Sequence, residues 1–406
     1  MMKRLNTIFA LFFAASLILS CGEDRTYQFL ELTEECQWIY AQMKEHYLWN
    51  DSIKQPARSK FFSKSSDFYK SLLQKEDKTS FFGDSAADTS YGLSYMLMRD
   101  PLGIQPSRSY ALVLYVEPQS PAHRAGVTRG MWIASIGGKE PSSSNQAMLV
   151  NGKATTLCIK SIIFDEEQQK DVWSAADTLS MDIAEYNSPV AVPVDTIYNR
   201  GARKAGYIVL NNFNEGEAAS SLSAAVSQMK AEQVDDIVLD LRYNSGGSLA
   251  EAAECASILA DDANAGKLFC STRSNALLSH TAEYLFEPAA LLDATARIYI
   301  LVSSRTMATA QLFVASLQQT MEARQITVIG ETAGVQPYIT QELVSPYGFA
   351  ISPVVATLYT ADGNILSSNS VVVDNRLDEL ENITRIYPLG DIRETLLNKA
   401  LSAVEE

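Results

Sequence analysis

The second half of the chain alternates between strand-like and helix-like segments, and this alternation restricts the fold more than any other feature of the sequence. The strand-like runs are short and apolar, and the stretches between them are longer and favour helix. Strands are expected at 206–213, 236–241, 298–302 and 326–329, and helices at 218–231, 249–259 and 308–321. Such alternation places helices on the faces of a largely parallel sheet. Residues 186–406 are therefore predicted to form an α/β core.

Two smaller regions are expected before this core, so the predicted fold class is α+β with several domains. Residues 21–85 carry apolar side chains at helical spacing, as at Met43 and Tyr47, and are predicted to be a small helical cap. Residues 86–185 contain dense apolar and aromatic runs, such as 110–116, which predict a β-rich domain.

The charge balance restricts the class of partner. The chain of 406 residues carries 48 acidic and 33 basic side chains, which gives a formal net charge of −15. A surface this acidic repels phosphate backbones and argues against a nucleic-acid partner. No phosphate-binding loop and no Cys or His spacing typical of a metal site occurs, so neither a cofactor nor a metal is expected. The pairing of four cysteines is left open: Cys36, Cys158, Cys255 and Cys270.

The N-terminal segment predicts export. Residues 1–20 begin with basic side chains, continue with a short apolar stretch and end in a small residue, which is the pattern of a secretory signal. The run from Ile18 to Cys21 resembles the bacterial lipobox, in which the cysteine is lipidated. We therefore expect a lipoprotein anchored through Cys21, in the outer membrane and on its periplasmic or surface face. An ordinary signal peptide with a chance cysteine is the alternative.

The sequence from Val113 to Lys139 resembles a PDZ domain. A strand is followed by P-x-S-P-A-x-x-A-G, which ends at Gly126, and then by G-x-W-I-x-x-I-G-G. Met131 departs from the pattern, which usually has Asp at this place. PDZ domains bind an extended peptide as an added strand, and the backbone amides of one loop hold its terminal carboxylate. By position, the peptide-binding loop consists of Tyr91, Gly92, Leu93 and Ser94.

Motifs along the rest of the chain carry a broader resemblance. They are Gly206-Tyr-Ile-Val, Leu239-Asp-Leu-Arg-Tyr-Asn-Ser-Gly-Gly247, the stretch 303–311, Val328-Ile-Gly-Glu331 and Tyr387-Pro-Leu-Gly-Asp391. Together with the helical cap and the PDZ-like region, they make about residues 25–400 similar to the C-terminal processing, or tail-specific, serine peptidases. The resemblance implies a ClpP- or crotonase-like α/β core and a Ser–Lys dyad, in which a lysine of lowered pKa takes the proton of the serine.

Both members of that dyad are replaced in this sequence. The resemblance places the serine at Ala308, and the lysine at Val335 or, with a shift of one residue, at Gln336. No lysine occurs between Lys267 and Lys399, so a different alignment does not restore one. Arginine is no substitute, because it stays protonated. Neighbouring motif positions have changed as well, and we interpret the chain as a natural pseudopeptidase.

The glycine-rich turn of the family motif is intact. The resemblance implies an oxyanion-binding site formed by the backbone N–H groups of Gly246, Gly247 and Thr309. Such a site needs no side-chain chemistry. The alternative interpretation is that the two glycines only form a strand-to-helix turn with positive φ.

Three functions remain open at this point. The first is a lipoprotein that binds extended peptides or protein C-termini without cleaving them, and another is a non-enzymatic scaffold in an outer-membrane complex. The third is an active endopeptidase with a displaced nucleophile, for which Thr309 is the candidate and His280 or Glu331 would be the base. The sequence does not predict the oligomeric state.

Overall fold

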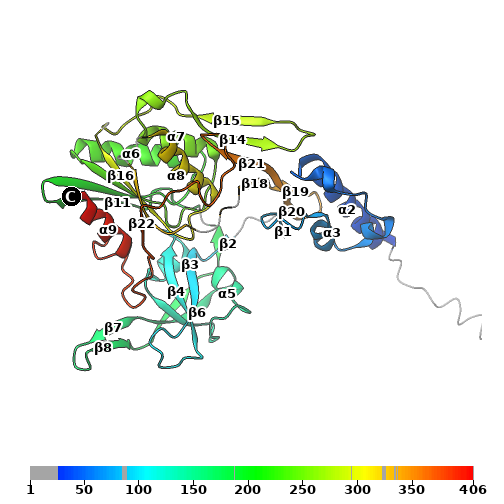
Figure 1. The fold of residues 1–406 in the computed structure, drawn as a ribbon. Helices are drawn as coiled ribbons and strands as arrows, with labels where there is room; N and C mark the ends of the chain where they lie inside the picture. Colours follow the sequence, from blue (N-terminus) through cyan, green and yellow to red (C-terminus); the bar gives the residue numbers. More distant parts are fainter. Residues whose placement is uncertain are drawn as a thin grey trace, which may run out of the picture. The chain divides into compact units, whose positions relative to one another are not determined.

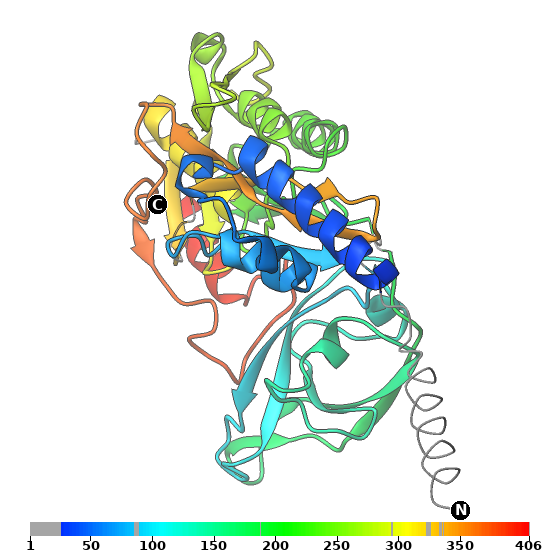
Figure 2. The same ribbon diagram turned by 90° about the vertical axis from the view of Figure 1, so that its right-hand side faces the viewer.

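The computed structural model describes residues 26–84, 89–186, 188–293, 295–321, 326–332, 335 and 337–405. The described residues form two compact units (Figures 1 and 2). The first, called here the N-terminal unit, contains residues 26–84 together with 274–280 and 339–356, and the remaining residues form the main unit. The predicted lipidation site, Cys21, lies outside the described residues. Within them, no helix has the length and apolar character needed to cross a membrane.

The N-terminal unit combines helices with a small sheet. Its helical elements are α2 (Thr26–His46), η1 (Asn50–Ser52), η2 (Arg58–Phe62) and α3 (Ser65–Leu72). Its strands are antiparallel, in the order β1 (Phe81–Asp84), β20 (Phe349–Ser352) and β19 (Leu343–Val344). Met43 and Tyr47 are buried, as expected, and the Tyr47 hydroxyl donates to Asp77 at 2.8 Å. The helices confirm the prediction for this region, whereas the sheet is not visible in the local sequence pattern.

The β-rich part of the main unit extends over residues 89–186. Its five-stranded antiparallel sheet has the order β3 (Leu93–Arg99), β4 (Ser109–Val116), β5 (Trp132–Ile136), β6 (Thr155–Lys160) and β9 (Asp177–Met181). Further pairs are β2 (Thr89–Ser90) with β10 (Glu185–Tyr186), and β7 (Ile162–Asp165) with β8 (Lys170–Trp173). The short helices are α4 (Pro121–Arg124) and α5 (Ala147–Val150). In this arrangement β3 is an edge strand.

The α/β part of the main unit is built on a six-stranded sheet. The order is β11 (Val194–Arg200), β12 (Arg203–Val209), β13 (Asp236–Asp240), β16 (Arg297–Val302), β17 (Ile326–Gly330) and β22 (Asn375–Arg376), and only β11 is antiparallel to its neighbour. The helices are α6 (Ala218–Ala231), α7 (Leu249–Leu259), α8 (Ala308–Thr320) and α9 (Thr395–Val404), with the short η3 (Asp262–Asn264). A four-stranded sheet has the order β15 (Thr281–Leu285), β14 (Leu268–Ser274), β21 (Val354–Thr360) and β18 (Tyr338–Thr340), and its strands β18 and β21 include residues of the 339–356 segment.

Helices cover both faces of the six-stranded sheet (Figure 1). On one face, Leu397 and Leu401 of α9 pack with Tyr207 of β12. On the other face, α6 lies so close to β12 that a Cβ at Gly206 would be 2.3 Å from the Met229 sulfur. Successive strand residues point to opposite faces, so both faces of β12 are buried. The α/β core expected from the alternation is therefore confirmed.

Some boundaries differ from the sequence prediction. β12 ends at Val209 because the next residues leave the sheet: the Asn211 N–H donates to the Ala191 carbonyl at 2.8 Å and the Phe213 N–H to the Gly246 carbonyl at 2.9 Å. The segments 274–280 and 339–356, which the sequence analysis includes in the 186–406 core, belong to the N-terminal unit. Their partners lie far away along the chain, so no local pattern could have assigned them.

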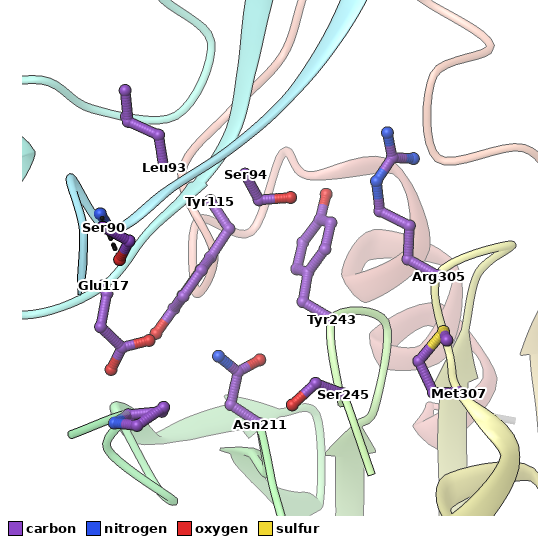
Figure 3. Close-up of a pocket in the computed structure, with 12 residues that line it drawn as sticks. Ser90, Leu93, Ser94, Tyr115, Glu117, Asn211, Tyr243, Ser245, Arg305 and Met307 are labelled. Atoms are coloured by element: carbon purple, nitrogen blue, oxygen red, sulfur yellow. Dashed lines mark hydrogen bonds between the residues drawn. The ribbon is translucent and has the colours of Figure 1, made fainter. Parts of the chain in front are cut away.

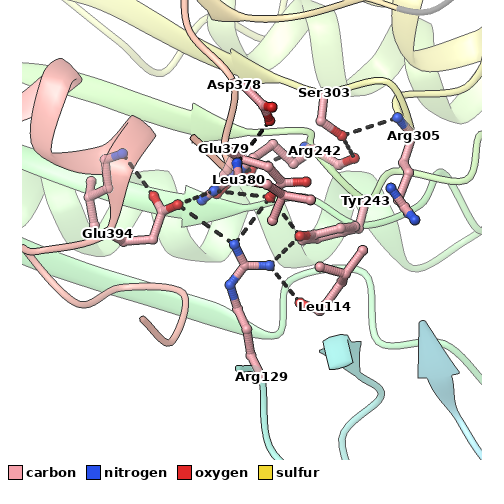
Figure 4. A network of polar contacts seen from close by, with 12 residues as sticks. Leu114, Arg129, Arg242, Tyr243, Ser303, Arg305, Asp378, Glu379, Leu380 and Glu394 are labelled. Atoms are coloured by element: carbon pink, nitrogen blue, oxygen red, sulfur yellow. Dashed lines mark hydrogen bonds and ion pairs between the residues drawn. The ribbon is translucent and has the colours of Figure 1, made fainter. Parts of the chain in front are cut away.

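Buried polar contacts join the two parts of the main unit (Figure 4). Arg129, from the β-rich part, donates to the Leu114 carbonyl at 2.7 Å and to Glu379 at 3.1 Å. The Tyr243 hydroxyl, from the α/β part, donates to the same Glu379 carboxylate at 2.6 Å. Because a buried charge is stable only when it is paired and hydrogen-bonded, these contacts hold Tyr243 in place.

Arg242 is the centre of the same network. Its guanidinium is 0% exposed and pairs with Asp240 at 2.6 Å and with Glu394 at 2.5 Å. Its backbone carbonyl accepts a hydrogen bond from the Ser303 hydroxyl at 2.7 Å. Burial by itself would raise the pKa of Asp240, but the adjacent guanidinium lowers it below its ordinary value. The network therefore fixes the chain directly before the glycine-rich loop.

Candidate functional site

The loop between β13 and α7 is held by its own side chains. Asn244 is buried, its amide nitrogen donates to the Leu210 carbonyl at 2.9 Å, and its Oδ1 accepts from the Gly246 N–H at 2.8 Å. Gly247 has a φ of 137°, and a Cβ there would lie 2.5 Å from the Phe213 carbonyl oxygen. Only glycine fits this position, which explains the second glycine of the motif.

The N-terminus of α8 lies against this loop. The Met307 N–H donates to the Asn244 carbonyl at 3.0 Å, and α8 begins at the next residue, Ala308. The Thr309 hydroxyl donates to the Gly247 carbonyl at 3.3 Å. The structure thus brings the predicted nucleophile position together with the residues predicted to bind an oxyanion.

Two of the three predicted oxyanion N–H groups are available. The Gly246 N–H is not, because it donates to Asn244 Oδ1. No described residue accepts a hydrogen bond from the N–H of Gly247 or Thr309. Thr309 lies in the first turn of α8, where N–H groups have no partner within the helix. An oxyanion-binding role of the remaining pair stays a prediction.

Those predicted base positions that lie in the described part of the main unit show no partner for Thr309. Val335 is partly buried and apolar, and Gln336 lies outside the described residues. Glu331 is exposed, and His280 belongs to the N-terminal unit. Within the described residues of the main unit, no carboxylate or imidazole hydrogen-bonds to the Thr309 hydroxyl.

A cavity of about 350 Å³ opens beside the loop in the main unit (Figure 3). One side is lined by Gly92, Leu93 and Ser94 of the predicted peptide-binding loop, and another by Ser245 and Met307 of the two segments just described. This volume is typical of ligand sites. The other lining residues are Ser90, Tyr115, Glu117, Pro189, Asn211, Tyr243 and Arg305.

Tyr91, the fourth residue of the predicted loop, does not line the cavity. Its hydroxyl donates to the Lys153 carbonyl at 2.6 Å and its N–H to the Val150 carbonyl at 2.8 Å, so it is anchored inside the β-rich part. Gly92 has a φ of 73°, and a Cβ there would lie 2.3 Å from the Ser120 Cβ. The tight turn at Gly92 leads the chain from this anchor to the cavity.

The start of β3 presents an open sheet edge at the cavity. The Asp100 N–H, just after β3, donates to the Arg108 carbonyl, just before β4, at 3.0 Å, so the backbone groups of Asp100 point toward the partner strand. In an antiparallel pair this direction alternates from residue to residue. The backbone groups of Tyr95 and Leu97, an odd number of residues before Asp100, therefore face away from β4. Arg305 donates to the Tyr95 carbonyl at 3.3 Å. An edge of this kind is what strand addition requires.

A buried carboxylate lies at one end of the cavity. Glu117 is 8% exposed, and the Val190 N–H donates to its Oε1 at 2.6 Å. Burial raises the pKa of Glu117 above its ordinary value and outweighs the hydrogen bonds from the Val190 N–H and the Tyr115 hydroxyl, which lower it; the neighbouring Glu217 raises it further. Within the part of the chain that the structure describes, no Lys, Arg or His forms an ion pair with Glu117.

Tyr115 and Asn211 lie beside Glu117. The Tyr115 hydroxyl is in hydrogen-bond contact with the side chains of Glu117 and Asn211. Asn211 is 6% exposed, and its Oδ1 has no hydrogen-bond partner among the described residues. Figure 3 shows the Asn211 nitrogen on the side of Glu117 and its oxygen turned toward Ser245. Sequence reasoning missed these three residues, because they lie at the ends of two separate strands and no motif marks them.

The raised pKa of Glu117 makes a prediction about stability. Glu117→Gln should increase the free energy of unfolding at neutral pH by about 1 kcal/mol, the usual scale when a strained functional group is replaced. A carboxyl whose pKa is higher in the folded state than in the unfolded state contributes most to the free energy of unfolding below its unfolded pKa of about 4.3. This stabilisation is lost as pH rises through the folded pKa. The gain should therefore be small near pH 4 and grow toward neutral pH.

Urea unfolding between pH 4 and pH 8 measures this difference. The titratable groups that act on Glu117, namely Tyr115 and Glu217, stay unchanged in both proteins. Glu166→Gln, at an exposed position between β7 and β8, is the matched control and should show no such pH dependence. A pH-independent loss of stability in Glu117→Gln would contradict the assignment.

The part of the chain that the structure describes contains neither a metal-binding cluster nor a disulfide. Among the described residues, no three His, Cys, Asp or Glu side chains are placed to hold a metal ion. The cysteines Cys36, Cys158, Cys255 and Cys270 are free in the structure. Burial raises the pKa of Cys36 to about 11 and that of Cys270 to about 12, so both remain thiols at neutral pH.

Comparison with known proteins gives matches over the same regions. Residues 204–375 match the model of peptidase family S41, and residues 34–84 match that of the peptidase S41 N-terminal domain. A "Probable CtpA-like serine protease" of Staphylococcus aureus is 24% identical over 214 residues, which are 52% of this chain and 39% of the relative. The chloroplastic carboxyl-terminal-processing peptidase 2 of Arabidopsis thaliana is 30% identical over 191 residues, 44% of this chain and 34% of the relative. The chain thus spans well under half the length of these curated relatives.

Solved structures show the same architecture. The crystal structure of a candidate S41 protease from Bacteroides fragilis matches with a TM-score of 0.74 and 25% identity, over 90% of this chain and 96% of that one. A photosystem II D1 C-terminal processing protease has the same fold, with a TM-score of 0.55 and 15% identity over 92% of this chain and 98% of that one. By sequence and fold together, this chain belongs to peptidase family S41.

Proposed function

We propose that this member of the S41 family binds extended peptides or protein C-termini without cleaving them. The start of α8 is the observation that carries the proposal. A methyl group, that of Ala308, stands where the family resemblance places the nucleophile, and the hydroxyl of the next residue, Thr309, donates to the Gly247 carbonyl. A hydroxyl is a weak nucleophile unless a base takes its proton, and a backbone carbonyl is not such a base.

The cavity and the edge of β3 form the binding site in this proposal. A peptide would add to β3 as a further strand, as in a PDZ domain, starting at Leu93 and Ser94. The Arg305 guanidinium lines the cavity and offers charge-assisted hydrogen bonds to a terminal carboxylate. The N–H groups of Gly247 and Thr309, two residues further along the chain than the cavity-lining Ser245 and Met307, are further donors in this proposal.

Export and membrane anchoring are part of the same proposal. The pattern of residues 1–20 and the lipobox-like run before Cys21 support a lipoprotein. Acyl chains on Cys21 would hold the binding site close to a membrane, on the periplasmic or surface side.

Fluorescence anisotropy with labelled decapeptides tests the proposal. Peptides with a free C-terminal carboxylate should bind the purified chain at least about tenfold more tightly than the same peptides as C-terminal amides, because the amide removes the charge that Arg305 recognises. After prolonged incubation, mass spectrometry should find the peptides intact. Binding of neither form would contradict the proposal and favour the scaffold function.

Matched variants make the test specific. Met307→Asp, at an exposed position that lines the cavity, should weaken binding by repelling the carboxylate. Ile163→Asp, equally exposed but in the β7–β8 hairpin, should not. Cleavage that disappears in Thr309→Val would support the alternative, an endopeptidase with a displaced nucleophile.

A further inference from the structure

We propose that residues 54–64 of the N-terminal unit, called here the basic segment, dock this unit onto an anionic phospholipid surface. The inference goes beyond the proposed function, because it concerns a different surface and involves no bound peptide. The partner is defined by its chemistry: a membrane whose phospholipid headgroups carry negative charge.

The first argument is the charge of the basic segment. It contains four basic side chains and no acidic one, in a chain whose formal net charge is −15. All four are exposed, and within the described part of the chain none of them forms an ion pair. A basic cluster on an otherwise acidic protein is complementary to an anionic lipid surface. The four residues are Lys54, Arg58, Lys60 and Lys64.

The second argument is the aromatic surface between these charges. Phe62, the last residue of η2, is 51% exposed. With Tyr40 and Phe61 it lines a cavity of about 590 Å³, and the lining contains Arg58 but no acidic residue. Exposed aromatic rings beside basic side chains are typical of segments that enter the headgroup region of a membrane. An acidic polypeptide would engage the charges alone, so the exposed ring favours phospholipid.

The basic segment is held in a fixed conformation by the helices of its own unit. The rings of Tyr40, in α2, and Phe61 contact each other edge to face at 6.0 Å, and the Tyr40 hydroxyl donates to Gln55 at 3.0 Å. Phe61 also packs against Phe68 of α3, with 5.1 Å between the ring centroids. Because the segment is already ordered, little conformational entropy is lost when it docks.

The third argument is the place of the basic segment relative to the proposed anchor. Thr33 of α2 lines the same cavity and lies seven residues, or about 10 Å, after the start of the helix at Thr26. Cys21 lies five residues before Thr26, and five residues reach at most about 18 Å. Acyl chains on Cys21 would therefore keep the basic segment close to the membrane, and docking would orient the unit on its surface.

Vesicle sedimentation tests this inference. The chain from residue 21 on, with Cys21→Ser, carries neither the predicted signal segment nor acyl chains. It should bind phosphatidylcholine vesicles that contain about 30% phosphatidylglycerol at least about tenfold more tightly than pure phosphatidylcholine vesicles, although its net charge is negative. The double substitution Arg58→Gln with Lys60→Gln should lower the affinity for the anionic vesicles by about tenfold.

Matched variants separate the basic segment from charge and apolar surface elsewhere. Lys139→Gln with Lys153→Gln changes the net charge equally at exposed positions of the main unit and should leave vesicle binding unchanged. Phe62→Ser should weaken binding, whereas Ile163→Ser, at a position that is 50% exposed, should not. Circular dichroism melting curves show that each variant keeps its fold.

The outcomes distinguish this inference from the proposed function. Equal binding to both kinds of vesicle, or equal losses in the basic-segment variants and their controls, would overturn the inference and leave peptide binding standing. Binding to soluble poly-L-glutamate but not to anionic vesicles would overturn it in favour of an acidic polypeptide. Docking on anionic vesicles by a chain that binds no decapeptide would support the inference and contradict the proposed function.

Discussion

Arg242→Met should lower the free energy of unfolding by about 3–5 kcal/mol, because it breaks a buried ionic network by removing one sign of charge. The guanidinium lies 2.6 Å from Asp240, 2.5 Å from Glu394 and 3.5 Å from Glu379. Without it, Glu379 and Glu394 share Arg129, and Asp240 keeps no cationic partner among the described residues, so the loss of pairing dominates the small gain from an apolar side chain. Urea unfolding followed by circular dichroism measures the change.

Arg393→Met is the matched control for this substitution. Arg393 is 64% exposed and pairs with Asp391 at 2.6 Å. An exposed pair contributes about 0–1 kcal/mol, so the control should stay close to the unmodified protein. A loss below about 1 kcal/mol for Arg242→Met would show that the network does not hold the two parts of the main unit together.

Gly247→Ala should be the most damaging substitution within the site itself. The added Cβ would lie 2.5 Å from the Phe213 carbonyl oxygen, and alanine would have to adopt a φ of 137°. Backbone strain and overpacking each cost about 1–3 kcal/mol, so we expect a loss of about 2–4 kcal/mol. The loop would shift away from Thr309, and peptide binding should weaken by about tenfold or more.

Gly246→Ala separates strain from steric clash. Gly246 also has a positive φ, 93°, but its nearest neighbour would be the Thr309 hydroxyl oxygen at 3.5 Å, an ordinary contact. Only the strain of about 1–2 kcal/mol should remain. Denaturation and peptide titration of both variants measure the difference. Equal losses in the two proteins would show that the close approach to Phe213 does not decide the conformation of the loop.

The sequence predicts those parts of the fold that local patterns determine. The helices α6 and α7 have the predicted bounds, and α7 begins directly after Ser248, whose hydroxyl accepts from the Glu251 N–H at 3.4 Å as an N-cap. The sheet of the N-terminal unit could not be predicted in this way, because β1 pairs with β20, a strand that lies far away along the chain. Such pairing leaves no periodic signal near either strand.

The candidate site likewise contains residues that the sequence predicts and residues that it does not. Gly246, Gly247 and Thr309 belong to motif strings, and the structure places them in contact as expected. Glu117 and Asn211 could not be found, because a buried carboxylate and a buried amide at the ends of two strands look like ordinary polar residues until the strands are assembled. Among the described residues, Glu117 has no cationic partner and Asn211 Oδ1 has no hydrogen-bond partner, and both facts follow from three-dimensional packing, not from sequence.

The sheet in the N-terminal unit also has a consequence for biosynthesis. Phe81 pairs with Ser352, so the strand that completes this unit leaves the ribosome only after the whole segment between these two residues has been synthesised. Until then the apolar sides of α2 and α3 have no sheet to cover them, and closing so long a loop is slow. The nascent chain must therefore pass through a period in which a chaperone, or its own later segments, shields those helices from aggregation.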